Sequence, residues 1–248
     1  ITARKSGYNV IIMQSHDSYE EEVSMAKSLY SSRVSGIICS IGMKTIDTSH
    51  FQQFVNNNIP VVFVDRVPKD FIPFRVIINN YAAGYKATKH LIDQGCKRIA
   101  HITAGSEFGN LYNERKRGYI DALKQYNLPV EKELMVDLKT VTYNEALKAS
   151  NRLLDLKNRP DGVFASGDIM AVSAIQSAKR KGIRVPEDIA VIGFNNDPIS
   201  EIIDPNLSTI THPAAKMGQM SAEIILKSIK FPNKDEVKEI TFLNTEVL

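Results

Sequence analysis

The chain has 248 residues, of which 43% are hydrophobic and 24% are charged, and its formal net charge is +3. This length predicts one large domain or two smaller ones, and the composition is typical of a folded protein with a real core. The Lys and Arg residues form no concentrated stretch, so charge gives no basis for nucleic-acid binding by this chain. No stretch approaches the roughly 18 consecutive apolar residues of a membrane helix, and no membrane contact is expected.

The chain has two cysteines, Cys39 and Cys96. Cys39 ends an apolar run and Cys96 follows a predicted helix, so we expect two reduced, mostly buried thiols. Such thiols are typical of the reducing cytoplasm. Residues 1–7 lack the apolar core and the cleavage pattern of a signal peptide, and the sequence therefore predicts a cytoplasmic protein.

Short apolar runs alternate along the chain with longer amphipathic stretches. The early runs are almost entirely apolar and rich in β-branched residues, which is typical of strands buried on both faces of a sheet. The predicted strands are 8–13, 36–39, 61–64, 76–78, 98–102, 134–138, 162–165, 189–194, 208–211 and 239–242.

The segments between these runs contain the residue patterns that mark helix ends. Ser18 precedes three glutamates, and an N-cap followed by carboxylates is a helix-start signal. Thr142 and Glu145 have the spacing of a capping box. Gly95 and Gly182 each follow a predicted helix, at the position where glycine turns the chain into the left-handed region.

Strands that alternate with helices predict βαβ units, a parallel sheet and helices on both of its faces. About ten strands are too many for one comfortable open sheet. We therefore predict an α/β protein with two doubly wound parallel sheets, and hence two lobes.

Open α/β sheets bind ligands outside the carboxyl ends of their strands, and polar residues follow nearly every predicted strand here. Amide and carboxylate groups beside arginine are suited to the vicinal hydroxyls of a sugar. The strand-end candidates for ligand binding are Gln14, Ser15, Asn79, Asp168, Asn195 and His212. Capping of the following helix is an equally good reading of Asp168, and a plain surface turn is the alternative for His212.

The sequence contains none of the common catalytic or phosphate-binding motifs, such as G-x-S-x-G or G-x-x-x-x-G-K-[ST]. The five histidines lack the spacing of metal ligands. We therefore expect that the protein is not an enzyme and that it has no catalytic residues, no cofactor and no bound metal.

Several segments, taken together, resemble the lac/gal repressor family of bacterial transcription regulators. Residues 182–194 are similar to the family pattern G-x-x-V-P-x-D-I-x-V-x-G-F/Y almost throughout. The other segments are 61–66 with 76–80, 90–100, 114–119, 165–171 and 204–210. They cover essentially the whole chain, in family order and spacing.

The resemblance implies a periplasmic-binding-protein-like fold of type I, in which two lobes are joined by three crossovers and the ligand lies between them. The first lobe is then residues 1–103 plus 211–236. The second lobe is residues 104–210 plus 237–248.

The resemblance also implies roles for particular residues. Arg115 matches the arginine that clamps the effector, and Gly167 and Asp168 match a turn that offers polar contacts. Leu138 falls near a position that often holds an aromatic ring. Asn195, like Asn79, stands where the family has an aspartate, so the ligand of any one family member cannot simply be transferred.

The implied function is that of the ligand-sensing domain of a DNA-binding repressor, which binds a small effector, by expectation a sugar. The effector would shift the population of lobe orientations in a homodimer and so alter operator affinity. Operator DNA would be bound by an N-terminal helix-turn-helix head, which this chain does not contain, just as it lacks the family's first strand.

Two alternatives share the fold class. A periplasmic sugar-binding protein of a transport system is disfavoured by the N-terminal sequence, the unpaired cysteines and the closer match of residues 185–194 and 204–210 to repressors. A flavodoxin-like enzyme would need a nucleophile or a cofactor loop, and neither is found.

Overall fold

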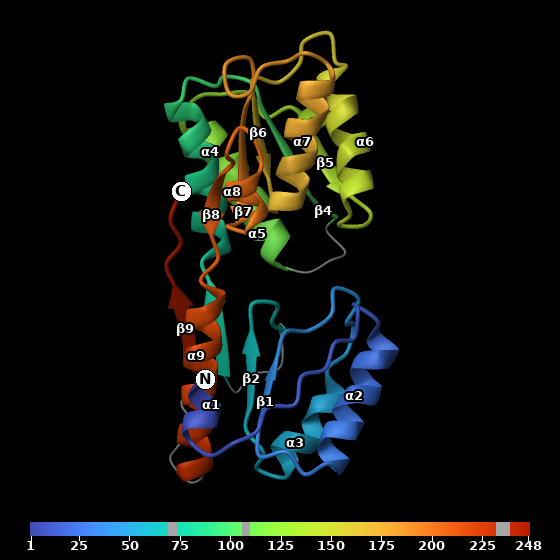
Figure 1. The fold of residues 1–248 in the computed structure, drawn as a ribbon, viewed down its shortest axis with the longest axis vertical. Coiled ribbons are helices and arrows are strands. Elements are labelled where there is room, and N and C mark those ends of the chain that lie inside the picture. The colour runs from blue at the N-terminus through green and yellow to red at the C-terminus, as the bar shows by residue number, and fades with distance from the viewer. Residues whose placement is uncertain (69–73, 106–109, 232–238) are drawn as a thin grey trace. The chain divides into compact units, whose positions relative to one another are not determined.

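The computed structural model describes residues 1–68, 74–105, 110–231 and 239–248 (Figure 1). These residues form two compact units. The first consists of Ile1–Ile78 with Pro213–Asn244, and the second of Asn79–His212 with Thr245–Leu248. The chain thus passes from one unit to the other three times, after Ile78, His212 and Asn244.

The first unit contains a parallel sheet with the strand order β1-β2-β3-β9. Helix α9 packs against β1, β2 and β3 on one face, and α2 and α3 lie on the other (Figure 1). The strands are β1 (Ile37–Cys39), β2 (Val61–Val64), β3 (Phe74–Ile78) and β9 (Glu239–Leu243). The helices are α1 (Thr2–Lys5), α2 (Tyr19–Ser31), η1 (Ser49–Phe51), α3 (Gln52–Asn56) and α9 (Ala214–Lys230).

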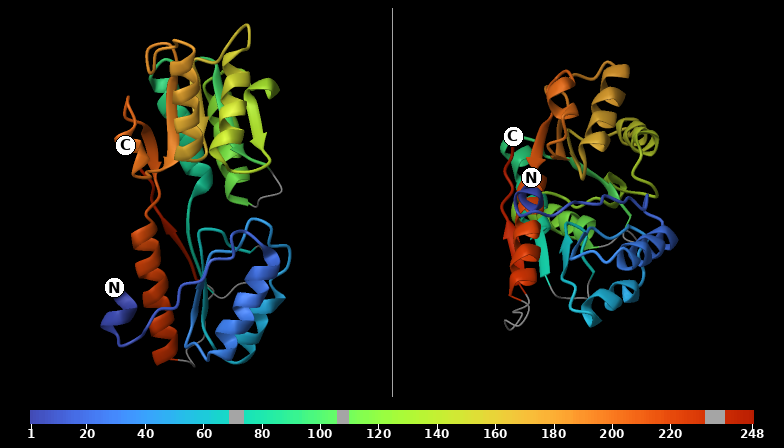
Figure 2. Two further views of the ribbon diagram at one scale, coloured as in Figure 1. Left: turned by 45° about the vertical axis from the view of Figure 1, so that its right-hand side comes forward. Right: turned by 60° about the horizontal axis from the view of Figure 1, so that its bottom comes forward.

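The second unit contains a parallel sheet with the strand order β5-β4-β6-β7-β8. Helices α6 and α7 cover one face, and α4 and α5 cover the other (Figures 1 and 2). The strands are β4 (Ile99–Ala104), β5 (Met135–Leu138), β6 (Gly162–Ala165), β7 (Ala190–Asn195) and β8 (Ser208–Thr211). The helices are α4 (Asn80–Asp93), α5 (Asn110–Gln125), η3 (Lys132–Leu134), α6 (Tyr143–Leu154), α7 (Asp168–Arg180) and α8 (Ile199–Ile202).

The prediction of two parallel sheets is confirmed, and every predicted strand from 36–39 onward is present. The predicted strand at 8–13 is wrong. These residues form neither helix nor strand, and Val10, Ile11 and Ile12 keep 65%, 57% and 88% of their surface exposed. A strand needs a neighbour to satisfy its main chain, and within the described part of the chain no other segment pairs with this one.

The predicted lobe boundaries differ from the observed units. Residues 79–103 were expected in the first lobe, but they belong to the second unit, because β4 pairs there with both β5 and β6 and α4 packs against α5. Residues 239–244 were expected in the second lobe but belong to the first unit, because β9 pairs with β3. The predicted boundary at 236 and 237 lies outside the described residues.

The predicted helix ends are confirmed. Ser18 and Thr142 accept hydrogen bonds from the third residue beyond each of them, and Gly95 and Gly182 have φ angles of +94° and +69°. Both cysteines are free thiols. None of the helices in the described ranges is long and apolar enough to cross a membrane.

Helices α4 and α5 cross with their main chains almost in contact. A Cβ atom added to Gly84 would lie 2.2 Å from the carbonyl oxygen of Arg115, and one added to Gly118 would lie 2.2 Å from that of Tyr81. Only glycine fits at either position, because the obstruction is backbone rather than a movable side chain. The crossing therefore fixes where the main chain of Arg115 lies.

We predict opposite effects for two glycine-to-alanine substitutions in helices. Gly84→Ala should lower the free energy of unfolding by about 1–3 kcal/mol or more, because α4 and α5 must move apart. Gly218→Ala in α9 meets no atom within 4 Å and should raise it by roughly 0.5–1 kcal/mol through helix propensity. Urea denaturation of the two variants measures both effects. Equal urea midpoints for Gly84→Ala and Gly218→Ala would show that a methyl group fits between α4 and α5.

Candidate functional site

The second unit gathers polar groups at the carboxyl end of its sheet. Residues 166–168 follow β6, Asn195 ends β7, and His212 follows β8. Arg115 reaches the same edge from α5. Neighbouring parallel strands end at one edge of the sheet, so these residues form one constellation, as their bonds to one another demonstrate.

Arg115 is the charged centre of this constellation. Its guanidinium group donates from Nε to Asn80 Oδ1 at 2.8 Å and from Nη1 to the carbonyl oxygen of Ser166 at 2.9 Å. The ring of Phe194 lies under the group, with 3.5 Å from Cζ to the ring centroid. Only 3% of the residue is exposed. A guanidinium with two acceptors and an aromatic face is held in one orientation in advance of any ligand.

Asp168 joins the turn after β6 to β8 and to the loop after β7. Its carboxylate is fully buried and accepts from the main-chain N–H of Asp197 at 2.7 Å and from Thr209 Oγ1 at 2.6 Å. A Cβ atom on Gly193 would lie 2.2 Å from Oδ1, so this glycine makes room for the carboxylate. Burial raises the pKa of Asp168, and the two hydrogen bonds offset part of that rise.

Helix capping by Asp168, one of its two expected roles, is wrong. The N-cap of α7 is Gly167, which has no side chain to accept a bond, and Asp168 is the first helical residue. Its two oxygens are directed instead to β8 and to the loop after β7. The carboxylate still lies at the positive end of the helix, which favours its charge.

Asn195 holds an unusual backbone conformation, with φ at +115°. Its side chain donates to Asp197 Oδ2 at 3.4 Å, and its carbonyl oxygen accepts from the N–H of His212 at 3.3 Å. Positive φ outside glycine is uncommon and is often found at functional sites. The main chain of His212 is thus tied to the end of β7.

Two predicted ligand residues, Leu138 and Asn79, have structural roles, although Asn79 is exposed to solvent. Leu138 is 4% exposed and packs in the core beside Ile102 and Leu134. Asn79 caps α4, because its Oδ1 accepts from the N–H of Ala82 at 2.9 Å. The next residue, Asn80, bonds Arg115, and two adjacent asparagines give no local signal of which one makes this contact.

The sequence also gave no sign of a buried histidine beneath the constellation. His101 of β4 is fully buried between the rings of Tyr119 and Phe164, with centroid distances of 4.9 and 4.6 Å. Its Nδ1 donates to the carbonyl oxygen of Phe164 at 3.0 Å. Burial lowers the pKa of His101 to about 3, so the ring is neutral at physiological pH.

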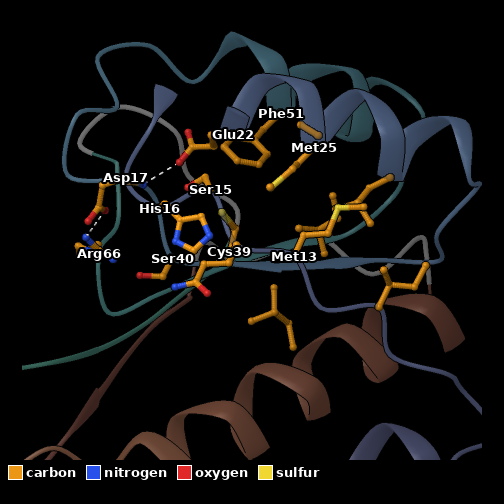
Figure 3. Close-up of a pocket in the computed structure, with 17 residues that line it drawn as sticks. Met13, Ser15, His16, Asp17, Glu22, Met25, Cys39, Ser40, Phe51 and Arg66 are labelled. Atoms are coloured by element: carbon orange, nitrogen blue, oxygen red, sulfur yellow. Dashed lines mark hydrogen bonds and ion pairs between the residues drawn. The ribbon is translucent and has the colours of Figure 1, made fainter. Parts of the chain in front are cut away.

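Gln14 and Ser15 lie in the first unit, where they line a cavity of about 260 Å³ (Figure 3). Asp17 and Arg66 face each other across its polar side with 2.8 Å between Oδ1 and Nη1. Met25, Phe51 and other apolar residues also line the cavity. No local pattern predicts the ion pair between Asp17 and Arg66, because the two residues are 49 positions apart.

Metal binding has no support in the part of the chain that the structure describes. No group of three or more His, Cys, Asp or Glu residues is placed there to hold an ion.

Comparison with known proteins identifies relatives over nearly the whole chain. The family model of the periplasmic binding protein-like domain matches residues 88–247. The HTH-type transcriptional repressor PurR of Vibrio atlanticus is 29% identical over 98% of this chain and 72% of the relative. The ribose operon repressor of Halalkalibacterium halodurans is 30% identical over 90% of this chain and 64% of the relative.

Among solved structures, a complex of the transcriptional regulator CelR with cellobiose superposes with a TM-score of 0.85 at 27% identity, over 99% of this chain and 73% of that chain. The chain thus spans roughly two thirds of the length of the curated relatives, 72% of one and 64% of the other.

The fold and the relatives define a periplasmic-binding-protein-like domain of type I, and the relatives are transcription regulators rather than enzymes. The chain belongs to the LacI family of transcriptional regulators, as their effector-binding domain. The resemblance inferred from the motifs is therefore confirmed.

We predict that the buried neutral state of His101 makes the protein less stable in acid. An unfolded histidine takes up a proton near pH 6.5, whereas the folded ring does so only near pH 3. The unfolded state binds more protons between these values, so the free energy of unfolding falls with decreasing pH, by up to about 1.4 kcal/mol per pH unit.

The measurement is urea denaturation at about pH 7, 6 and 5 for the wild type and for His101→Phe. The variant should lose stability less steeply in acid, and the contribution of Asp168 cancels because both proteins contain it. Equal slopes, or a His101 ring signal that titrates near pH 6.5 by NMR, would contradict the neutral assignment.

Proposed function

We propose that this chain binds a small polyhydroxylated effector, a sugar, through the strand-end residues of its second unit. Arg115 carries the proposal. A desolvated guanidinium, oriented in advance, bonds ligand oxygens more strongly than a solvated one and needs little reorganisation on binding.

The other candidate residues have supporting roles in this proposal. Asn195 offers an amide to hydroxyl groups, and Asp168 with Gly167 keeps the β6–α7 turn joined to the loop after β7. In the first unit, Gln14 and Ser15, with the adjacent Asp17–Arg66 pair, line a polar cavity and are proposed as ligand-binding residues of that unit. Leu138 and Asn79 are better regarded as core and cap, because their side chains are already engaged.

The ligand class rests on chemistry and on relatives. Neutral amides and a guanidinium suit hydroxyl groups, each of which both donates and accepts. One relative is named a ribose operon repressor, and one structural neighbour contains cellobiose. We therefore place sugars ahead of purines, although another relative is a repressor named PurR.

For the whole protein, we propose a homodimeric repressor that acts in the cytoplasm and binds operator DNA through a separate head. Effector binding would favour one conformation of the sensing domain, and the free-energy difference between conformations would be transmitted to the DNA affinity.

We expect one class of sugar to stabilise the chain in a thermal-shift screen against mono- and disaccharides, sugar acids, nucleosides and purine bases. At a ligand concentration of about 100 times Kd, a ligand specific for the folded state adds about 2.7 kcal/mol, which is roughly 5–10 °C for a chain of this size. A selective shift with a nucleoside or purine would overturn the sugar assignment, and no shift with any compound would refute binding of these ligand classes.

Arg115→Ala should weaken binding of the responding sugar by about 2–5 kcal/mol, because one partner of a buried polar contact is removed. Arg117→Ala is the matched control: it lies on the same helix, is exposed and pairs with Glu114 at 2.9 Å. Arg115→Lys keeps the charge but loses the planar fork, and we expect an intermediate affinity. Isothermal titration calorimetry measures all three, and wild-type affinity in Arg115→Ala would eliminate the arginine from the site.

A further inference from the structure

Two consecutive asparagines open the second unit and use their side chains differently. Asn79 Oδ1 accepts from the N–H of Ala82 and caps α4. Asn80 Oδ1 accepts from Nε of Arg115, 35 positions along the chain. The first bond is local and serves the helix, whereas the second is long-range and ends on the charged group of the candidate site.

The bond from Asn80 adds an in-plane restraint on the guanidinium to its contacts with Phe194, Tyr112 and Ser166. The rings of Phe194 and Tyr112 lie 3.5 and 5.4 Å from Cζ, and contact with a ring face does not by itself select one rotation of the planar group. Ser166 accepts from Nη1, which alone leaves the group able to pivot about that bond. A second hydrogen bond, donated by Nε at another position of the planar guanidinium, prevents this rotation.

The acceptor on Nε is itself fixed. Asn80 is the first residue of α4, and α4 is packed against α5 by the close approach of Gly84 to the main chain of Arg115. The helix that carries the acceptor and the helix that carries the donor therefore form one rigid pair.

We propose that Asn80 is a positioning residue, which orients the Arg115 guanidinium for the effector, and that Asn79 has no part in effector binding. The predicted effect on effector affinity rests on the proposed function, whereas the predicted orientation of the guanidinium does not. The two effects are therefore tested separately.

The first experiment needs no effector. The Nε–H signal of Arg115 is followed by ¹H–¹⁵N NMR in the wild type, Asn80→Ala, Asn80→Asp and Asn79→Ala. We expect a slowly exchanging signal in the wild type and in Asn79→Ala, and exchange at least about ten-fold faster in Asn80→Ala. Asn80→Asp should restore slow exchange, because a carboxylate also accepts this bond. Unchanged exchange in Asn80→Ala would overturn the positioning role.

The second experiment measures affinity by calorimetry for the sugar that gives the largest thermal shift, with cellobiose and ribose as the first probes. Asn80→Ala should bind about ten- to a hundred-fold more weakly, the range for losing a hydrogen bond to a charged group, and Asn80→Asp should recover most of the affinity. Asn79→Ala should melt at a lower temperature through loss of its cap and bind with wild-type affinity.

The outcomes separate the two ideas. If no sugar binds the wild type, the proposed function fails, and the NMR exchange rates still decide whether Asn80 orients Arg115. If sugar binds and Asn79→Ala loses affinity while Asn80→Ala does not, the assignment of the two asparagines is reversed and the inference is wrong.

Discussion

The second unit is organised around a buried positive charge. Removing a guanidinium from water costs several kcal/mol unless its donors and its charge are compensated. Here Asn80, the main chain of Ser166 and the ring of Phe194 supply that compensation. These partners belong to α4, the β6–α7 turn and β7. A single charge therefore holds three separate elements together, and the guanidinium is oriented without a ligand.

Backbone packing determines where this charge can lie. Gly84 lets α4 approach the main chain of Arg115 so closely that no side chain fits between them. Asp168 carries a second buried charge, a carboxylate whose position depends on a glycine. Gly193 leaves room for the carboxylate, and Thr209 donates a hydrogen bond to it. Two glycines without side chains thus allow two buried charges at one edge of a sheet, which is where α/β proteins bind ligands.

The sequence predicted those features that depend on local patterns. Apolar runs identified the strands from residue 36 onward, and capping residues identified helix ends, because burial and capping leave their signals within a few residues. Segment 8–13 has the same apolar pattern but pairs with no other segment among the residues that the structure describes, so the pattern alone was misleading. The partners of Asp168 and Asn80 lie 29–41 positions away, and the unit boundary depends on strand pairs that are distant in the sequence. No local pattern encodes these contacts.

A crystal structure of the chain with a bound sugar tests the role of Arg115 most directly. We expect ligand hydroxyl oxygens within about 2.7–3.2 Å of its guanidinium nitrogens, with the ring of Phe194 and the side chain of Asn80 in the positions described above. A sugar bound elsewhere, with no oxygen in reach of Arg115, would contradict the view that this buried charge is built to receive the effector.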